Sequence, residues 1–104
     1  MSEISVSEAH NRYLSDQVVD VREDFEVQEG LIPSAIHIPL GQLRTQMSKL
    51  IKTKPVIVVC RSGQRSALAS RMLNQAGFSA STVTGGMKAW KKAGFPISAK
   101  EDNV

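Results

Sequence analysis

The sequence predicts a single α/β domain built on a largely parallel β-sheet. Short apolar runs, of which residues 56–59 are the clearest, alternate along the 104-residue chain with segments of helical periodicity. Strands that alternate with helices are typical of βαβ units, whose sheets are parallel. The uninterrupted apolar character of residues 56–59 suits a strand that helices cover on both faces. We expect one core, because chains of about 100–150 residues usually form a single domain.

The first half of the chain opens with a helix-capping pattern. Ser5 is followed three residues later by Glu8, which predicts a helix that runs through about Leu14. The next elements are predicted in the order strand 17–21, short polar helix 23–29, strand 35–38 and a helix within 40–50. Gly30 suits the end of the second helix, and the last helix rests on apolar residues that share one face.

The second half repeats the alternation at the same pitch. It is predicted as strand 56–59, helix 65–75, strand 81–84, helix 87–93 and a polar, flexible tail over 98–104. Gly77 suits the end of the first of these helices, and Gly85 and Gly86 interrupt the chain after the second strand. The domain is expected to span 1–104, with its core over about 4–97.

Composition excludes several classes of protein. The single cysteine allows neither an internal disulfide nor a CxxC cluster, and His10 and His37 show no metal-ligand spacing, so no metal or cofactor is expected. The net charge is only +3, and the lysines near the C-terminus suit a solvated helix face rather than a nucleic-acid site. No apolar run approaches the roughly 20 residues that cross a membrane. Without a signal-peptide pattern at the N-terminus, the predicted location is the cytoplasm.

Polar and glycine-rich segments follow three of the predicted strands. These are Asp20-Val21-Arg22, the turn that begins at Cys60, and Thr84-Gly85-Gly86. In a parallel α/β sheet, ligands bind outside the carboxyl ends of the strands. The topology therefore gathers these segments at one edge of the sheet, where we expect the functional pocket.

Cys60 is the strongest candidate for a reactive residue. It lies at a strand-to-helix turn, where backbone N–H groups and the positive end of a helix dipole favour a negatively charged sulfur. Arg61 and Arg65 add positive charge to the same turn. Gly63 can adopt a positive φ, which allows several N–H groups to point inward as an anion nest.

The spacing of this turn distinguishes among thiol chemistries. Four residues separate Cys60 from Arg65, whereas protein-tyrosine phosphatases and their relatives need a Cys-x5-Arg loop, sized for a tetrahedral phosphate. At the position where that arginine would stand, this chain has Ser66. The smaller loop fits one extra sulfur atom better than a phosphoryl group.

Three stretches of the chain together resemble the single-domain rhodanese (thiosulfate sulfurtransferase) family. They are residues 18–23 with 30–39, the loop Cys60-Arg61-Ser62-Gly63-Gln64-Arg65-Ser66, and residues 85–90 with 93–96. Their order and spacing match the family over most of residues 17–97. Many relatives have Gly-His-Ile-Pro-Gly-Ala where this chain has residues 30–35, and Leu31 replaces that histidine. An orienting role at the pocket rim is therefore not expected of Leu31.

The resemblance implies a five-stranded, mainly parallel sheet with helices on both faces, and it assigns roles to the loop. Cys60 would accept sulfane sulfur from a donor such as thiosulfate and pass it, as a persulfide, to cyanide or a thiol. Substrate binding would fall to the six residues that follow it, Arg61, Ser62, Gly63, Gln64, Arg65 and Ser66. Supporting, mainly structural roles would fall to Asp20, Arg22, Gly85 and Gly86, with Asp20 anchoring the active loop.

Two other functions remain open at this point. A persulfide relay or non-catalytic module for a partner protein would need the same loop as the sulfurtransferase. A phosphatase-like or arsenate-reducing enzyme is disfavoured by the loop length and by the absence of a second cysteine that could resolve an intermediate. The implied partners are a small anionic sulfur donor, a thiol or cyanide acceptor and, for the relay, another protein; neither nucleic acid nor a membrane is expected.

Overall fold

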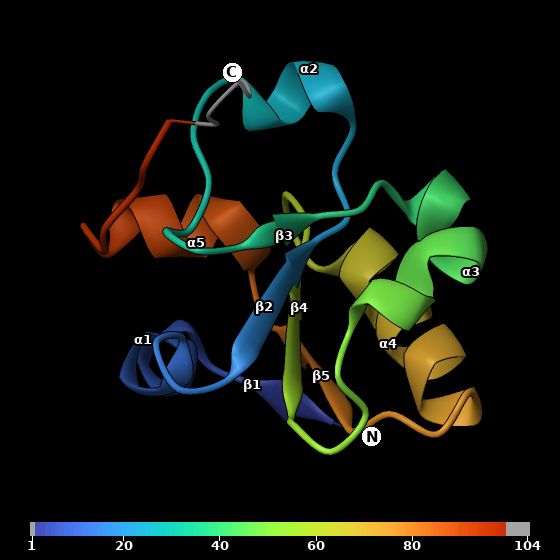
Figure 1. Ribbon diagram of the computed structural model, residues 1–104. Helices are drawn as coiled ribbons and strands as arrows, with labels where there is room; N and C mark the ends of the chain where they lie inside the picture. The colour runs from blue at the N-terminus through green and yellow to red at the C-terminus, as the bar shows by residue number, and fades with distance from the viewer. Residues whose placement is uncertain (1, 100–104) are drawn as a thin grey trace.

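The computed structural model describes residues 2–99, and its centre is a five-stranded sheet whose neighbouring strands all run parallel (Figure 1). The strands, in sheet order, are β1 (Glu3–Ile4), β5 (Ala80–Val83), β4 (Val56–Val59), β2 (Gln17–Asp20) and β3 (Ile36–His37). The predicted α/β class, the parallel sheet and its five strands are confirmed. Asp20 lies opposite Val59 in the register of β2 with β4, so these two central strands end at the same level.

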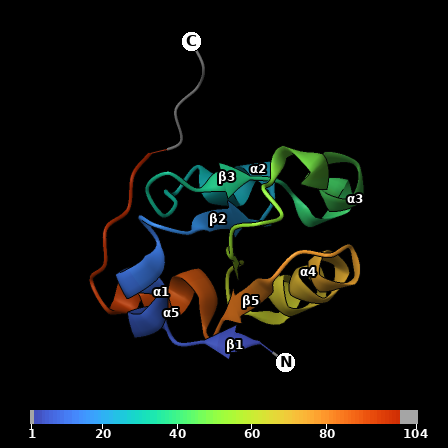
Figure 2. The ribbon, with the colours of Figure 1, turned by 60° about the horizontal axis from the view of Figure 1, so that its bottom comes forward.

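Helices cover both faces of the sheet, as expected. They are α1 (Val6–Arg12), α2 (Asp24–Val27), α3 (Leu43–Gln46), α4 (Gln64–Gln75) and α5 (Gly86–Lys92). Figure 2 shows α1 and α5 on one face and α3 with α4 on the other. The short helix α2 lies beyond the carboxyl end of β2 (Figure 1). Within residues 2–99, no helix has both the length and the apolar character that a membrane crossing needs.

The core is divided by the sheet into two apolar layers. Along β4, Val56 and Val58 pack into the layer under α3 and α4, whereas Ile57 packs into the layer with Trp90 of α5. This alternation follows from the two-residue period of a strand. Cys60 continues the first series and is buried in the same layer as Val58, so the strand delivers the thiol to the α4 side of the sheet.

The segment 40–50 differs from the single helix that the sequence predicts. It consists of a 3₁₀ turn over Leu40–Gln42, the one-turn helix α3 and a second 3₁₀ turn over Met47–Lys49. A glycine and a β-branched threonine in this segment have low helix propensity, and 3₁₀ turns are common where an α-helix is not sustained. The apolar face is still used, because Leu43 and Leu50 are buried.

The two ends of the chain also add detail. Strand β1 has only two residues, which is too short for periodicity to reveal, whereas the cap that follows it is present: the Ser5 hydroxyl accepts the Glu8 N–H at 3.0 Å. Near the C-terminus, Ser98 and Leu31 exchange two backbone hydrogen bonds of 2.9 Å in an isolated antiparallel bridge. Ser98, the first residue of the tail predicted to be flexible, therefore pairs with Leu31, and residues 100–104 of that tail lie outside the described part.

Candidate active site

The loop after β4 places Cys60 against the start of α4. Cys60 is the first residue beyond the strand, and α4 begins four residues later, at Gln64. Gly63 has φ +115°, a conformation that favours glycine, and it turns the chain back toward the sulfur. Only 1% of Cys60 is exposed, so its own loop and the core beneath cover it almost completely.

Main-chain groups of the loop surround the Cys60 sulfur. Sγ accepts hydrogen bonds from the N–H groups of Gly63 at 3.1 Å and Ser66 at 3.3 Å, and the Ser66 Oγ lies 3.5 Å away. Burial, the largest single influence, raises the pKa of the thiol. The hydrogen bonds from the Ser66 hydroxyl and from the N–H groups of Ser66, Gly63 and Ser62 together outweigh it, and the pKa falls below its ordinary value of 9.0. The arrangement favours a thiolate.

A buried hydroxyl chain extends from the sulfur into β5. The Ser66 Oγ contacts Cys60 on one side and forms a short hydrogen bond with the Thr82 Oγ1 on the other, and it also reaches the Gly63 carbonyl at 3.2 Å. Thr82 is only 6% exposed. Sequence reasoning did not select Thr82, because nothing in the sequence indicates that residue 82 of a strand would face residue 66 of a helix.

The start of α5 packs directly on the backbone of the Cys60 loop. Met87 N–H donates to the Cys60 carbonyl at 2.8 Å, and Lys88 N–H donates to the Arg61 carbonyl at 3.0 Å. A Cβ atom on Gly86 would lie 2.6 Å from the Arg61 carbonyl oxygen and closer still to that of Cys60. Glycine at position 86 therefore permits the contact, while Gly85 has φ +81° and precedes the first turn of the helix.

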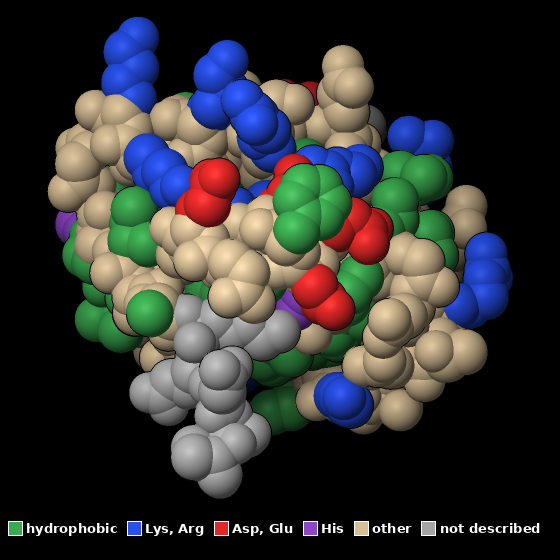
Figure 3. All heavy atoms as spheres, turned by 90° about the horizontal axis from the view of Figure 1, so that it is seen from above, with side chains coloured by type: hydrophobic (Ala, Val, Ile, Leu, Met, Phe, Trp, Pro, Cys, Tyr) green, Lys and Arg blue, Asp and Glu red, His purple; other side chains and the backbone are tan. Residues whose placement is uncertain are grey.

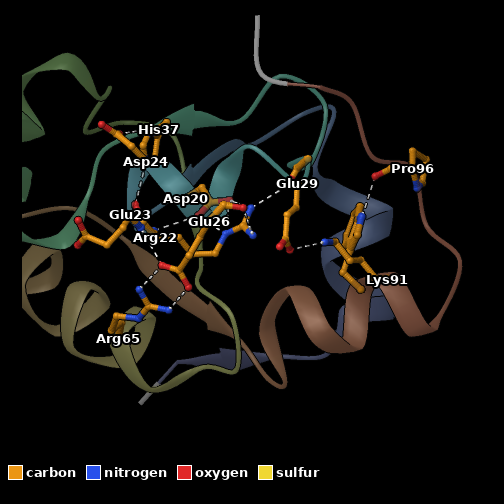
Figure 4. A network of polar contacts seen from close by, with 12 residues as sticks. Asp20, Arg22, Glu23, Asp24, Glu26, Glu29, His37, Arg65, Lys91 and Pro96 are labelled. Carbon is orange, nitrogen blue, oxygen red and sulfur yellow. Dashed lines mark hydrogen bonds and ion pairs between the residues drawn. The ribbon is translucent and has the colours of Figure 1, made fainter.

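Arg65 forms an ion pair that the sequence did not predict. Its Nη1 and Nη2 donate to Oε1 and Oε2 of Glu26 in α2 at 2.7 and 2.8 Å (Figure 4). The hydrogen bond from Arg65 is the main cause that lowers the pKa of Glu26 from 4.5 to about 2, against the opposing effect of burial. Arg65 was expected to attract an anionic donor, but its two terminal nitrogens are occupied by this carboxylate. Arg65 lies 39 positions after Glu26 in the chain, so sequence spacing gave no signal for Glu26.

Asp20 and Arg22 form a buried pair that supports α2. The Arg22 guanidinium donates to both carboxylate oxygens of Asp20 at 2.7–3.1 Å, and both residues are almost fully buried. Arg22 also donates to the carbonyls of Gly30 at 2.9 Å and Glu26 at 3.4 Å (Figure 4). The contacts of Asp20 therefore hold Arg22, and through it the segment that carries Glu26, rather than the Cys60 loop itself, which was the expected anchor point.

Three other loop residues, Arg61, Ser62 and Gly63, line two hollows of the surface. One, of about 260 Å³, is bordered by Arg22, Phe25, Glu26, Glu29, Arg61, Met87, Lys88 and Lys91. The other, of about 150 Å³, includes Ser62 and Gly63. Figure 3, seen from the end of the molecule where α2 lies, shows Lys and Arg side chains gathered beside acidic ones. Gln64 is exposed at the first turn of α4.

Comparison with known proteins identifies the family to which this loop belongs. The family model described as the rhodanese-like domain matches residues 5–93. The chain belongs to the rhodanese-like domain family. A rhodanese-related protein from Thermoplasma volcanium has a similar crystal structure, with a TM-score of 0.91 and 33% identity over 96% of this chain and all of that one. The family resemblance seen in the sequence is thereby confirmed.

Relatives of this rhodanese-like chain have names that refer to sulfur chemistry. It is 40% identical to the Bacillus subtilis protein named "Putative sulfurtransferase YtwF" over 88% of this chain and 91% of that one. It is 36% identical to a sulfurtransferase of Allochromatium vinosum over 91% and 94% of the two chains. A third relative, the B. subtilis protein named "Putative sulfur carrier protein YrkF", is 34% identical over 85% of this chain, which covers half of that longer protein.

Proposed function

We propose that this protein is a sulfurtransferase that moves sulfane sulfur from a donor such as thiosulfate to a cyanide or thiol acceptor through a persulfide on Cys60. The single observation that carries the proposal is the position of Sγ, which accepts N–H groups of Gly63 and Ser66 at 3.1 and 3.3 Å. These donors stabilise a negative charge on the sulfur before and after it gains a second sulfur atom. Family membership and the sulfurtransferase names of two relatives support it.

The proposed reaction has two displacement steps. In the first, the Cys60 thiolate attacks the outer sulfur of thiosulfate; a new S–S bond forms, the bond to the sulfonate group breaks, and sulfite leaves with that electron pair. In the second, cyanide or a thiolate attacks the outer sulfur of Cys–S–S⁻, which releases thiocyanate or a new persulfide and restores the Cys60 thiolate. The charge balances in both steps, and the covalent intermediate makes the cycle ping-pong.

The test of this function is the mass of the protein after incubation with thiosulfate. We expect the intact protein to gain the mass of one sulfur atom and to lose it when cyanide is added. Because Cys60 is the only cysteine, the site of the gain needs no peptide mapping. The matched control is Cys60→Ser, which should neither gain the mass nor produce thiocyanate. Equal sulfur transfer by Cys60→Ser would overturn the proposal.

A persulfide relay to a partner protein is the second candidate, and the sulfur carrier name of one relative favours it. The same cysteine cradle serves both functions, so they differ in the acceptor rather than in the loading step. We expect a relay to show negligible turnover with small acceptors and to transfer labelled sulfur to one protein captured by the persulfidated chain. Rapid turnover with cyanide and thiols would instead support the free-standing enzyme.

Phosphatase-like or arsenate-reducing activity has less support than sulfur transfer. Four residues separate Cys60 from Arg65, and both terminal nitrogens of Arg65 are bound to Glu26, so they do not line an empty phosphate cradle. Hydrolysis of an aryl phosphate that depends on Cys60 would be the result that supports this activity. We expect none above the rate of the Cys60→Ser protein.

A further inference from the structure

The ion pair between Glu26 and Arg65 lies beside the Cys60 loop. Both terminal nitrogens of the guanidinium bind both carboxylate oxygens, an arrangement that is stronger and more directional than a single contact. The Arg65 side chain is 34% exposed and that of Glu26 is 16% exposed, so the pair lies partly within the surface. Arg65 directly precedes Ser66, whose N–H donates to the Cys60 sulfur at 3.3 Å, so the ion pair lies close to the thiol; the Glu26 carboxylate and, more weakly, Cys60 raise the pKa of Arg65.

The Glu26 carboxylate is held from behind. The Oε1 atom of Glu26 accepts the Glu23 N–H at 2.9 Å, and the backbone carbonyl of Glu26 accepts a hydrogen bond from the Arg22 guanidinium at 3.4 Å (Figure 4). Arg22 is in turn fixed by the buried carboxylate of Asp20. The carboxylate is therefore built into the fold, and Arg65 does not become available to an anion through a simple side-chain rotation of Glu26.

Other cations in the hollow beside the loop remain available. Arg61 and Lys88 border the hollow of about 260 Å³, and neither forms an ion pair with any residue from 2 to 99. Lys91 has only a loose contact of 3.8 Å with the exposed carboxylate of Glu29. Attraction of an anionic reagent to the site therefore depends on these residues, while Glu26 cancels the charge of Arg65.

We propose that Glu26 is a specificity-determining residue that weakens the binding of strongly anionic reagents at Cys60. Coulomb attraction scales with the charge of the reagent, so cancelling one cation penalises a dianion such as thiosulfate more than a monoanion. Resting on the proposed sulfur transfer, this inference names the preferred donor class: persulfides that carry a single negative charge, rather than dianionic thiosulfate.

The first test uses alkylation of Cys60 and needs no sulfur transfer. Iodoacetate and iodoacetamide are similar in size, but only the former is charged, so the ratio of their rates reports the field at the sulfur. For Glu26→Gln we expect the ratio to rise about fivefold at low ionic strength, and the rise to shrink in about 0.5 M salt. The iodoacetamide rate should stay within about twofold of the parent protein, which checks that the loop is intact.

The matched control is Glu29→Gln, which removes the same charge from the rim of the same hollow. Glu29 is 76% exposed and does not touch Arg65, so we expect its ratio to change less than about twofold. Arg65→Gln tests the sign, because it leaves the Glu26 carboxylate without its partner and should lower the ratio. The double variant Glu26→Gln/Arg65→Gln should return to within about twofold of the parent.

Donor kinetics then separate this inference from the function on which it rests. In Glu26→Gln, kcat/KM should rise about 25-fold for dianionic thiosulfate and only about fivefold for the persulfide of 2-mercaptoethanol, which, like iodoacetate, has one negative charge. An unchanged alkylation ratio, or one that Glu29→Gln changes equally, would overturn the role of Glu26. If the ratio shifts as expected but no donor ever loads Cys60, the role of Glu26 in charge selection stands and the sulfurtransferase proposal is overturned.

Discussion

At the scale of single residues, the lowered pKa of Cys60 depends on groups that hold hydrogen bonds in a defined direction. The Ser66 hydroxyl is shared among Cys60, Gly63 and Thr82, and only its contact with the sulfur favours the thiolate. The Ser66 O–H donates to the Gly63 carbonyl at 3.2 Å, so it has to turn toward the sulfur to stabilise a thiolate. A hydrogen bond from the Thr82 hydroxyl to Ser66 Oγ would strengthen that contact, because hydrogen bonds in a buried chain strengthen one another. We therefore expect Thr82 to act as a positioning residue for the thiolate.

Replacing Thr82 with valine tests this chain. We expect Thr82→Val to move the pH profile of Cys60 alkylation by iodoacetamide to higher pH and to slow alkylation at pH 7 about threefold, which is the effect of losing part of one hydrogen bond. Thr82→Ser keeps the hydroxyl and should restore the parent profile. A valine variant with an unshifted pH profile would show that Thr82 has only a packing role.

The residue scale also shows where sequence reasoning was sufficient and where it was not. The position of Cys60 after a buried strand, and the turn at Gly63, follow from local patterns that the sequence displays. The partners Glu26 and Thr82 could not be predicted, because each depends on which elements the fold brings together: α2 against the start of α4, and β5 beneath it. The sequence predicted the position of the cysteine and its turn, whereas the groups that interact with Arg65 and Ser66 are known only from the tertiary structure.

At the scale of secondary-structure elements, the contact between α5 and the Cys60 loop leaves no room for a side chain at position 86. Gly86 has φ +56°, and any Cβ atom there would collide with the loop backbone. The first N–H groups of α5 bind the Cys60 and Arg61 carbonyls, so a helix that shifts outward would pull on the loop. Position 86 therefore couples the placement of a helix to the geometry around the sulfur.

Substitution of this glycine should affect both stability and reactivity. We expect Gly86→Ala to lower the free energy of unfolding by about 2–4 kcal/mol, through steric overlap and the left-handed backbone, and to change the alkylation rate of Cys60. Gly94→Ala is the matched control, because Gly94 has φ +77° but no atoms near its would-be Cβ. It should cost only about 1 kcal/mol and leave the alkylation rate unchanged. If urea unfolding showed that both variants lose the same free energy of unfolding, a clash between the added Cβ atom and the loop backbone would not explain the effect at position 86.

Elements differ in how much of their form the sequence predicts. The bounds of strand 56–59 and of the helix that follows it were predicted within one residue, because a continuous apolar run and a periodic helix flanked by glycines are strong local signals. The segment 40–50 has a helical apolar face, yet it folds as three short pieces, because burial of Leu43 and Leu50 needs their positions and not an unbroken helix. Periodicity predicts which face is buried more reliably than it predicts hydrogen bonding.

At the scale of the whole molecule, the Glu26–Arg65 pair joins α2, beyond the end of the sheet, to α4 on one of its faces. The pKa of Glu26 is lowered to about 2 in the folded protein, so its charged form is favoured by folding. The associated stability is present above the ordinary carboxyl pKa of 4.5 and is lost as pH falls from there through about 2. Because the pair is partly solvated, its contribution is far smaller than the full shift implies.

Urea unfolding across pH measures this contribution. We expect Glu26→Gln to be less stable than the parent protein by about 1 kcal/mol at pH 7, and the difference to narrow steadily as pH falls below about 4.5. Glu29→Gln, which alters a pair at 3.8 Å between exposed groups, should match the parent at every pH. A difference for Glu26→Gln that stays constant between pH 7 and 3 would mean that packing, and not charge, accounts for it.

The sulfur of Cys60 is held chiefly by main-chain N–H groups, and this bears on how the protein could be redesigned. Backbone donors persist when side chains are exchanged, so the identities of the exposed residues Ser62 and Gln64 are free to vary without loss of the cradle. Libraries confined to these two positions and to Arg61 would therefore sample new donors and acceptors on an unchanged nucleophile. The loop therefore has a backbone part, which binds the sulfur and has to be kept, and exposed side chains, which can be changed.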